Sequence, residues 1–364
     1  MTQTEINPHR YCVIMCGGIG SRFWPYSRAD KPKQFLDLFG TGRSLLQMCY
    51  DRMLSLVRPE NIFVVTNRNY VGMVSEQLPD ITADRMLLEP TRRNTAPCIA
   101  WAAWHIAAMD PKASMIVAPS DHLITRETVF DECVMRGFDF VECHDALLTL
   151  GINPTRPETG YGYIQIGREI EPKLLEVKTF TEKPSKDLAQ VFIDTGEFFW
   201  NAGIFLWQAE VIKKAIRRYA PDMACVLDRG AEVFNTPDEE AYITANFPAC
   251  PSISIDFAVL EKADNVYVEC ANFGWSDLGT WGSLYENSDY DAARNVTVAS
   301  EVMTYNSSGN IFMAPAGKLV VAAGIHDCIV ADAGDVLLIC PRSDEQQIKV
   351  MLTDVKLCHK DRYL

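Results

Sequence analysis

Short apolar runs alternate with longer segments of helical spacing through the first half of the chain. Consecutive hydrophobic residues at 11–16, 62–66, 86–88, 115–118 and 147–152 predict buried strands. Between them, apolar positions recur three or four residues apart over 44–57, 95–108 and 129–143, which predicts helices. Such alternation is typical of right-handed βαβ units. It predicts an α/β fold with a Rossmann-like mixed, mainly parallel sheet flanked by helices.

The pattern changes after about residue 160 and again after about residue 290. The second part mixes strands, at 161–166, 177–181 and 203–207, with helices at 208–219 and 256–262. The last part holds short apolar pieces separated by Gly, Asn and Asp, at 311–313, 318–322, 328–331, 336–339 and 348–352, which predict strands. We therefore expect a large domain at 1–288, with parts at about 1–155 and 156–288, and a small C-terminal β domain at 289–364.

A loop rich in glycine follows the first predicted strand. Gly17, Gly18, Gly20 and Ser21 come directly after the run 11–16. Glycine has no Cβ, so backbone N–H groups at these positions can approach a phosphate closely. Arg22 and Lys33 add two cations to the same loop. This combination predicts a site for a triphosphate.

Two common phosphate loops do not fit this segment. A Walker A loop requires Lys followed by Ser or Thr directly after its last glycine, and that pair is absent. The dinucleotide fingerprint of Rossmann dehydrogenases requires a third glycine, where Phe23 stands, and a helix that begins at once. Pro25 and Pro32 instead prolong an irregular loop, which counts against a dehydrogenase.

Further motifs follow the glycine loop along the chain. They are Pro32-Lys33-Gln34-Phe35-Leu36, Glu89-Pro90-Thr91-Arg92-Arg93-Asn94-Thr95-Ala96-Pro97, Pro119-Ser120-Asp121-His122, Glu158-Thr159-Gly160-Tyr161-Gly162-Tyr163-Ile164, Thr181-Glu182-Lys183-Pro184, Trp200-Asn201-Ala202-Gly203-Ile204-Phe205, Ser254-Ile255-Asp256-Phe257-Ala258-Val259-Leu260-Glu261-Lys262 and Gly274-Trp275-Ser276-Asp277-Leu278-Gly279. In this order they resemble the sugar-1-phosphate nucleotidyltransferase family. The similarity is greatest to its mannose-1-phosphate guanylyltransferase branch and covers about three quarters of the chain.

The resemblance implies an activity and a division of labour. It implies transfer of GMP from GTP to α-D-mannose 1-phosphate by direct in-line attack with Mg²⁺, giving GDP-mannose and pyrophosphate. The nucleotide would bind the part at about 1–155 and the sugar phosphate the part at about 156–288. The C-terminal domain would be a left-handed β-helix-like unit. The residues alone do not distinguish guanine from other bases.

Such a reaction brings several phosphate groups together, so charge neutralisation dominates its chemistry. The nucleophile is already an anion, and no Ser–His–Asp triad is needed. The candidate catalytic residues are Arg22 and Lys33, which would stabilise the leaving pyrophosphate, and Asp121 and Asp277, which would bind Mg²⁺. Read alone, Asp121 could be a helix cap or turn residue, Asp277 a turn residue and Lys33 a solvated surface lysine.

The remaining candidate residues are assigned by the resemblance. Those for the nucleotide are Gly17, Gly18, Gly20, Ser21, Arg22, Lys33, Glu89, Asn94, Thr95 and Ser120. Those for the sugar phosphate are Gly160, Glu182, Lys183 and Asn201, of which Asn201 could also be a turn residue before a strand. His122 is expected to be structural, because Mg²⁺ does not favour imidazole. Trp101, Trp104 and Met109 have helical spacing and are expected in the core.

Composition and charge count against several classes of binding partner and cellular location. A formal net charge of −14 argues against nonspecific binding to nucleic acid or membranes. Twelve cysteines, without a C-x-x-C pair and partly inside apolar runs, indicate free thiols in a reducing cytoplasm. The segment 1–10 lacks an apolar signal region, and no apolar stretch is long enough for a membrane span. The sequence allows a homodimer. It also leaves open another hexose 1-phosphate or NTP, and a regulatory paralogue that binds a nucleotide sugar without catalysis.

Overall fold

The computed structural model describes residues 6–18 and 20–364. Ile19 of the glycine loop and residues 1–5 of the polar N-terminus lie outside the described residues. The chain forms two compact units, each made of several segments. Unit 1 consists of Met1–Gly17, Cys49–Ser120 and Ile124–Trp275, and unit 2 of Gly18–Met48, Asp121–Leu123 and Ser276–Leu364. The domain boundary between 288 and 289 stays a prediction.

Unit 1 contains a nine-stranded sheet with the order β3-β2-β1-β4-β9-β6-β10-β8-β7. The strands are β1 (Arg10–Cys16), β2 (Ile62–Asn67), β3 (Met86–Glu89), β4 (Ser114–Pro119), β6 (Leu147–Ile152), β7 (Gly162–Glu171), β8 (Leu174–Glu182), β9 (Phe198–Gln208) and β10 (Val266–Ala271). Eight of them agree with the predicted ranges to within a few residues at most ends, except that β7, β8 and β9 are considerably longer than expected. The sequence analysis missed β10.

The direction of the strands changes across this sheet. The four strands β3-β2-β1-β4 are parallel, as the βαβ pattern predicts. From β9 onward most neighbours are antiparallel, and only β6 and β10 form another parallel pair. The sheet is therefore mixed, and the expectation of a mainly parallel sheet is wrong for its second half, because β7 and β8 form an antiparallel hairpin and β9 pairs antiparallel with β4, β6 and β7.

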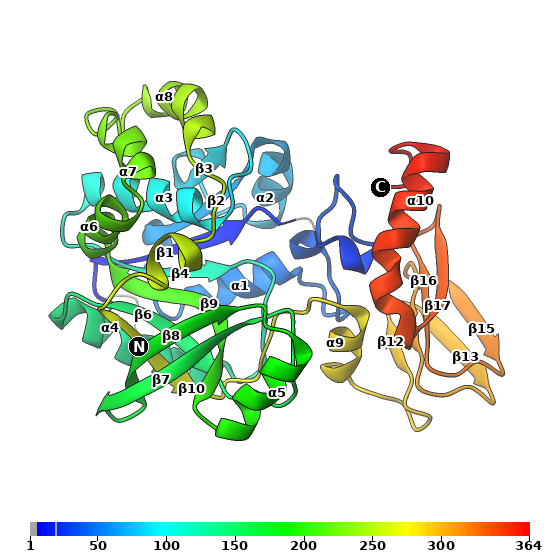
Figure 1. Ribbon diagram of the computed structural model, residues 1–364. Helices are drawn as coiled ribbons and strands as arrows, with labels where there is room; N and C mark the ends of the chain where they lie inside the picture. The colour runs from blue at the N-terminus through cyan, green and yellow to red at the C-terminus, as the bar shows by residue number, and fades with distance from the viewer. Residues whose placement is uncertain (1–5, 19) are drawn as a thin grey trace. The chain divides into compact units, whose positions relative to one another are not determined.

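Helices cover both faces of this sheet around β1, β2 and β4, which are buried on both sides, whereas β7 and β8 are partly exposed. Val13 and Ile14 are adjacent in β1, point to opposite faces, and are both fully buried. In Figure 1, α3 and α6 lie on one side of the sheet and α4 on the other. The helices of the unit are α2 (Val71–Gln77), α3 (Thr95–Met109), α4 (Glu127–Cys143), α5 (Lys186–Thr195), α6 (Ala209–Tyr219), α7 (Pro221–Asp228) and α8 (Glu239–Asn246).

The carboxyl ends of the parallel strands carry the motifs that the sequence places there. β1 ends at Cys16 before Gly17, β3 ends at Glu89, and β4 ends at Pro119 before Ser120. Because β1 lies between β2 and β4 with parallel register, these ends share one edge of the sheet. Ligands of open α/β sheets bind at such an edge. The expected convergence of these motifs is confirmed.

Unit 2 contains a β-rich coil built from successive turns of the chain. β12 (Val296–Val298), β14 (Ile311–Met313) and β16 (Cys328–Asp332) form one parallel ladder, and β13 (Glu301–Tyr305) and β15 (Leu319–Ala323) form a second. Each turn thus adds one strand to each ladder, and β17 (Leu337–Pro341) closes the first ladder with an antiparallel pair. The expected C-terminal β-rich region is present. The short helix α9 (Trp281–Glu286) precedes the coil.

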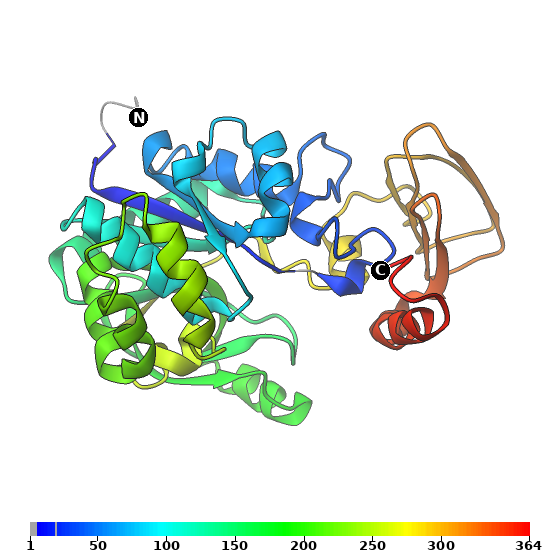
Figure 2. The same cartoon turned by 90° about the horizontal axis from the view of Figure 1, so that it is seen from above.

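One predicted strand of unit 2 is wrong. The segment 348–352, expected as a β piece, begins the helix α10 (Ile348–His359), which lies beside the coil in Figure 2. Ile348 is fully buried in the core of this unit, and Met351, Leu352 and Val355 pack against the same core. These positions have the i, i+3, i+4, i+7 spacing of a helix, which a five-residue window does not reveal.

Three further elements each contain a boundary between a segment of unit 1 and a segment of unit 2. They are α1 (Leu45–Met53) and the short strands β5 (Leu123–Ile124) and β11 (Trp275–Ser276). Trp101 and Trp104 are buried core residues as expected, whereas Met109, at the end of α3, is 42% exposed. All twelve cysteines lie in the described residues, and none of them forms a disulfide. Over residues 6–18 and 20–364, no helix is both long and apolar enough to cross a membrane.

Candidate functional site

Gly20 and Lys33 fix the shape of the glycine loop, which we define as residues 17–36. Gly20 has a φ of +68°, a left-handed conformation that side chains rarely adopt. An added Cβ at Gly20 would lie 2.5 Å from the Cβ of Lys33, so no other residue fits there without displacing the lysine. Lys33 begins the short 3-10 helix Lys33–Phe35 and is only 4% exposed. It is therefore a buried lysine, not a solvated one.

The ammonium of Lys33 brings two of the predicted residues together. Its Nζ lies 2.8 Å from Oδ2 of Asp121. The same Nζ donates hydrogen bonds to the carbonyl oxygens of Asp277, at 2.7 Å, and Leu278, at 3.1 Å. Asp121 and the Asp277 turn are far apart in sequence, and both contact one nitrogen. The three residues Lys33, Asp121 and Asp277 thus form one cluster in unit 2.

The Asp121 carboxylate of this cluster is ionised. Burial alone would raise the pKa of Asp121, but the charge of Lys33, that of His122 and the Lys33 hydrogen bond outweigh it, so the pKa of Asp121 lies below its usual value. Asp277 accepts a hydrogen bond from the backbone N–H of Gly279 at 2.9 Å through Oδ1. Carboxylates are hard oxygen donors of the kind that Mg²⁺ binds together with phosphate oxygens and water. The donor set therefore fits this ion.

No larger metal site accompanies these two carboxylates. Within the part of the chain that the structure describes, no three His, Cys, Asp or Glu side chains gather as metal ligands. His122 lies 4.0 Å from Oδ1 of Asp121 through its Nε2. That contact is electrostatic and gives His122 no ligand role.

The sequence analysis missed the role of one buried residue of the loop. Gln34 is 1% exposed, and its Nε2 donates a hydrogen bond to the carbonyl oxygen of Gly18 at 3.0 Å. It therefore ties the glycines to the segment that carries Lys33. Arg22 lies in the 3-10 helix Ser21–Phe23, and its buried Nε makes no hydrogen bond to described residues. An unpaired guanidinium N–H on a glycine loop is available to an anion.

Glu89, at the end of β3, is a buried carboxylate with an unused oxygen. Only 6% of the residue is exposed, and Oε1 has no hydrogen-bond partner among the described residues. Its Oε2 would lie 3.6 Å from a Cβ added at Gly17, so the carboxylate lies against the start of the glycine loop. Burial raises the pKa of Glu89 to about 7, although Arg92 acts in the opposite direction. The buried Oε1 atom thus has an unused capacity to accept a hydrogen bond among the described residues.

The other nucleotide candidates of unit 1 have structural partners. Asn94 has a φ of +67°, caps α3 and accepts a hydrogen bond from the N–H of Thr95 at 2.8 Å. The hydroxyl of Thr95 accepts from the N–H of Ile255 at 3.0 Å. Ser120 is 2% exposed, and its N–H donates to the carbonyl of Met15 at 3.0 Å. These residues shape the edge of the sheet next to Glu89.

The hairpin β7–β8 gathers the sugar-phosphate candidates. Its register pairs Gly162 with Glu182, so the start of β7, near Gly160, lies opposite the end of β8. A Cβ at Gly162 would lie 2.6 Å from Oε2 of Glu182, which shows that this glycine leaves room for the carboxylate. Lys183 is exposed, has a φ of +48° and forms an ion pair with Glu182. Left-handed backbone at a lysine is strained, and such strain clusters at functional sites.

Asn201 lies within β9 and not in a turn before it, and most of its amide is engaged. Its Oδ1 accepts hydrogen bonds from Thr149, at 3.0 Å, and the N–H of Gly203, at 3.0 Å. Its Nδ2 donates to Oδ1 of Asp256 at 2.8 Å. Asp256, to which the sequence analysis gave no role, begins the π-helical turn Asp256–Leu260. Burial and the nearby charge of Glu182 raise the pKa of Asp256.

Comparison with known proteins identifies the group to which these motifs belong. The nucleotidyl transferase family model matches residues 11–294. The mannose-1-phosphate guanylyltransferase of Salmonella montevideo is 37% identical in an alignment of 366 positions, gaps included, which covers 97% of this chain and 75% of that protein. That of Escherichia coli (strain K12) is 35% identical in an alignment of 370 positions, which covers 98% of this chain and 74% of that protein.

The chain belongs to the mannose-1-phosphate guanylyltransferase family of nucleotidyl transferases. The fold agrees with this. A solved structure named mannose-1-phosphate geranyltransferase, from Thermus thermophilus, has a TM-score of 0.85 and 29% identity, and covers 96% of this chain and 99% of its own.

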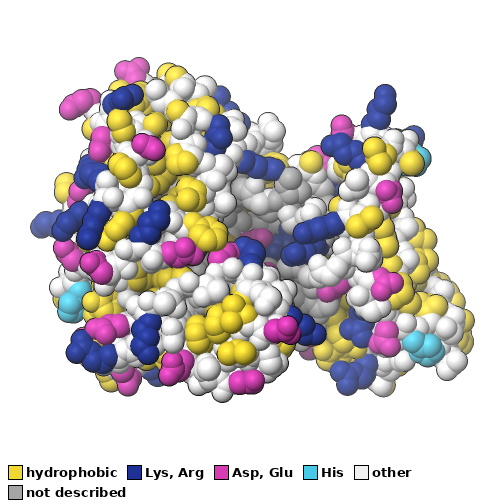
Figure 3. Space-filling view, in the orientation of Figure 1, with side chains coloured by type: hydrophobic (Ala, Val, Ile, Leu, Met, Phe, Trp, Pro, Cys, Tyr) yellow, Lys and Arg dark blue, Asp and Glu magenta, His cyan; other side chains and the backbone are white. Residues whose placement is uncertain are grey.

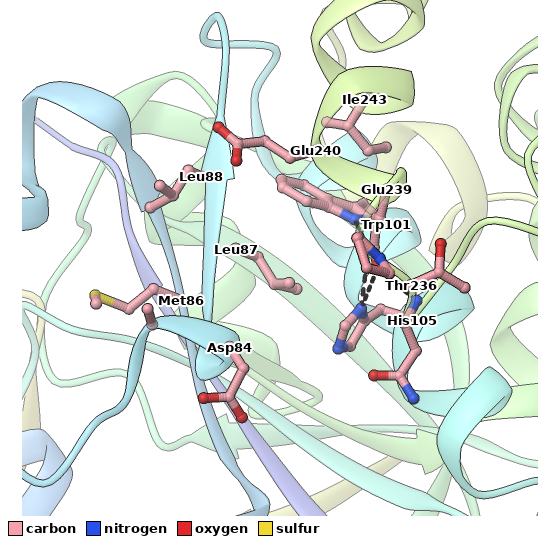
Figure 4. A pocket seen from close by; sticks show the side chains of 13 residues that line it. Asp84, Met86, Leu87, Leu88, Trp101, His105, Thr236, Glu239, Glu240 and Ile243 are labelled. Carbon is pink, nitrogen blue, oxygen red and sulfur yellow. Dashed lines mark hydrogen bonds and ion pairs between the residues drawn. The ribbon is translucent and has the colours of Figure 1, made fainter.

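Unit 1 of this nucleotidyltransferase has a pocket that lies apart from the predicted site residues. It has a volume of about 460 Å³ and is lined by β3, α3, α8 and the segment before α8 (Figure 4). Glu239 at its base accepts hydrogen bonds from Trp101 at 2.7 Å and from His105 at 2.8 Å. Its carboxylate also accepts from the N–H of Asn235 at 2.6 Å, so the buried polar groups satisfy one another. None of the predicted site residues lines this pocket.

Proposed function

We propose that this protein transfers GMP from GTP to α-D-mannose 1-phosphate and releases GDP-mannose and pyrophosphate. The observation that carries the proposal is the buried Lys33, which contacts the Asp121 carboxylate and the Asp277 backbone at once. A buried cation held by two acidic residues on a glycine loop is suited to a polyphosphate, because phosphate charge must be balanced locally on a protein with a net charge of −14. The names of the relatives agree with this substrate pair.

In the proposed mechanism the chain neutralises charge and orients the reacting groups. A phosphate oxygen of the sugar phosphate attacks the α-phosphorus of GTP in line with the departing pyrophosphate. Arg22 and Lys33 donate hydrogen bonds to the leaving group, whose negative charge increases as the bond breaks. The attacking oxygen is already ionised, so no side chain has to remove a proton. Backbone N–H groups of the glycine loop bind further phosphate oxygens.

Asp121 and Asp277 would hold Mg²⁺. The two carboxylates fit the ion by chemistry, since both are oxygen donors and Asp121 is ionised. The bound ion would screen phosphate charge, which supplies what two cationic side chains alone do not. Lys33, paired with Asp121, would then couple the ion to the glycine loop.

Guanine selection is proposed to rest on Glu89. Guanine presents two neighbouring donors, N1–H and the 2-amino group, and a carboxylate accepts both in a fork. The buried Oε1 of Glu89 lacks a donor among the described residues, which supports this pairing. Adenine has no donor at N1, so it would leave the buried carboxylate unpaired, at a cost of about 1–3 kcal/mol or more.

The sugar phosphate would bind the hairpin β7–β8. Lys183 is exposed and can exchange its ion pair with Glu182 for a phosphate. Glu182 would then accept hydrogen bonds from sugar hydroxyls, and Gly160 allows the ring to approach the backbone. Asn201 acts through its contacts with Asp256 and Thr149, and one N–H of its amide is left for the sugar.

Several finer points belong to the same proposal. The C-terminal coil is left-handed, as the family resemblance implies. The protein works in the cytoplasm, and a homodimer is compatible with it. Interspersed basic and acidic side chains on the face shown in Figure 3, with no continuous basic patch among the described residues there, fit a small-molecule substrate better than nucleic acid.

One assay tests the proposal against its alternatives. The protein is mixed with Mg²⁺, each of the common NTPs and a panel of hexose 1-phosphates, and released pyrophosphate is measured. The proposal requires release with GTP and mannose 1-phosphate above all other pairs. Preference for another pair would assign a different substrate, and nucleotide-sugar binding without any turnover would indicate a regulatory paralogue.

A further inference from the structure

Part of the glycine loop is not used by the proposed reaction, yet it is held by specific contacts. Trp24, Tyr26 and Arg28 follow Arg22 and carry no phosphate role. Each makes a polar contact with the C-terminal part of the same unit, at residues 332–364. The question is what these contacts do for the loop.

The three contacts reach three separate points of the C-terminal segment. The indole Nε1 of Trp24 donates to the carbonyl oxygen of Tyr363 at 2.8 Å. The hydroxyl of Tyr26 donates to the carbonyl oxygen of Asp332 at 2.7 Å. Arg28 forms a fork with Asp335, in which Nη1 lies 2.9 Å from Oδ2 and Nη2 contacts Oδ1.

These contacts act on the backbone next to Arg22. The Nε of Arg28 donates to the carbonyl oxygen of Pro25 at 2.8 Å, so the ion pair with Asp335 also holds the loop three residues after Arg22. Phe23, next to Arg22, is fully buried, and the centroid of its ring lies 5.3 Å from the centroid of the Trp281 ring. The residues that directly follow Arg22 are therefore held both by the buried Phe23 and by the contacts with the C-terminal segment.

We propose that the C-terminal segment is a positioning element for Arg22, and that Trp24 and Arg28 are the positioning residues through which it acts. The inference rests on the proposed function, in which Arg22 binds the triphosphate. A guanidinium that stabilises a developing charge must be held closely in place, because a small displacement weakens every hydrogen bond it makes. The C-terminal coil and α10 thus contribute to GTP binding without touching the nucleotide.

Matched variants separate positioning from mere stability. Asp335→Asn removes the charge that pairs with Arg28. Asp327→Asn removes the charge that pairs with Arg342, at 2.8 Å, in the same unit and on a more exposed aspartate. Asn also tolerates the φ of +52° at position 327. KM for GTP, KM for mannose 1-phosphate, kcat and the unfolding midpoint are measured for both variants and the unchanged protein.

We expect Asp335→Asn to raise KM for GTP or lower kcat by about two- to five-fold in total, the range for one exposed ion pair, and to leave KM for mannose 1-phosphate unchanged. Asp327→Asn should match the unchanged protein. Arg28→Ala should lose at least as much as Asp335→Asn, because it also removes the hydrogen bond to the Pro25 carbonyl, and the double variant should lose no more than Arg28→Ala. Equal kinetics for the two aspartate variants would overturn the inference, whereas an unchanged protein that makes no GDP-mannose would overturn the proposed function and the inference with it.

A second contact keeps the inference testable if one ion pair proves weak. Trp24→Phe removes the hydrogen bond to Tyr363, and Trp207→Phe removes an indole whose Nε1 is buried without a partner among the described residues. Both lose the same volume from a buried position. Only Trp24→Phe should raise KM for GTP, by about five-fold for one lost hydrogen bond. Equal KM values for GTP in the two variants would contradict the positioning role of Trp24.

Discussion

Lys33 Nζ lies 2.8 Å from the carboxylate of Asp121 and donates at 2.7 Å to the backbone carbonyl of Asp277. The lysine is 4% exposed, and its three N–H donors all have partners: the Asp121 carboxylate and the carbonyl oxygens of Asp277 and Leu278. A triphosphate offers the same ammonium stronger anionic acceptors, which would replace one or more of these partners. The positive charge is thus already in place before the substrate arrives.

Removal of either loop cation should affect catalysis strongly. Lys33→Ala and Arg22→Ala are each expected to lower kcat by on the order of 10²-fold or more, the usual cost of losing one charge-stabilising group. Steady-state pyrophosphate release measures this. Lys31→Ala is the matched control, because Lys31 is an exposed lysine of the same loop. A comparable loss of kcat in the control would mean that general surface charge, and not the buried cluster, determines the rate.

Asp121 and Asp277 should share one ion. Asp121→Asn and Asp277→Asn are each expected to raise the Mg²⁺ concentration that gives half-maximal activity. The paired change should cost much less than the sum of the single changes, because both remove the same ligand set. A Mg²⁺ titration of the three variants measures this. Fully additive losses in activity would show that the carboxylates act independently.

Lys183 should act on the sugar phosphate and not on the nucleotide. Lys183→Ala is expected to raise KM for mannose 1-phosphate with little change in KM for GTP, because its partner is bound in the ground and transition states alike. Lys178→Ala is the control. That lysine is an exposed residue of β8, the strand that Lys183 directly follows, and its Nζ lies 3.9 Å from Glu197. A variant that weakened GTP binding and spared mannose 1-phosphate would overturn this assignment.

The buried carboxylate of Glu89 should lower the free energy of unfolding once it is ionised. Burial raises its pKa from an ordinary 4.5 to about 7, so the folded state binds more protons than the unfolded state between these values. The free energy of unfolding should therefore fall as the pH rises through this window, by up to about 3 kcal/mol. Glu89→Gln should remove this dependence and raise the unfolding midpoint at pH 8, while Glu60→Gln, at an exposed glutamate, should not.

The Glu89 carboxylate also predicts how GTP binding depends on pH: binding should weaken as the pH falls, whereas the fold becomes more stable. If ionised Glu89 accepts from guanine, KM for GTP should rise as the pH falls below about 7, and Glu89→Gln should bind GTP more weakly. ITP, which lacks the 2-amino group, should lose less affinity on this substitution than GTP. Unchanged discrimination between GTP and ITP in the variant would show that Glu89 does not contact the base.

The order of strands and helices in the first half could be predicted because each element carries its own hydrophobic period. Leu147–Ile152 is such a case, with identical bounds in sequence and structure. The hydrophobic pattern predicted the wrong type of element where the element extends well beyond the short apolar segment that was considered. In α10 the buried Ile348 and the partly buried Val355 are seven positions apart, and only a window of that length separates a helix from a strand.

The sequence motifs named candidate site residues, whose roles stay predictions, but most of the partners of these residues could not be predicted. Motif order placed Lys33 and Asp121 in one site, and the structure brings them into contact. Nothing in the spacing indicated that Gln34 would bind the Gly18 carbonyl or that Asn201 would engage Asp256, because both depend on the exact path of the backbone. The contacts of Trp24 and Arg28 with residues more than 300 positions away were equally invisible.

The reverse reaction offers the most direct test of the account. GDP-mannose, Mg²⁺ and labelled pyrophosphate are incubated with the protein, with Lys33→Ala and with Lys31→Ala, and labelled GTP is measured. The account predicts labelled GTP with the unchanged protein and with Lys31→Ala, and a loss on the order of 10²-fold with Lys33→Ala. Absence of labelled GTP with the folded, unchanged protein, or equal formation by Lys33→Ala, would contradict it.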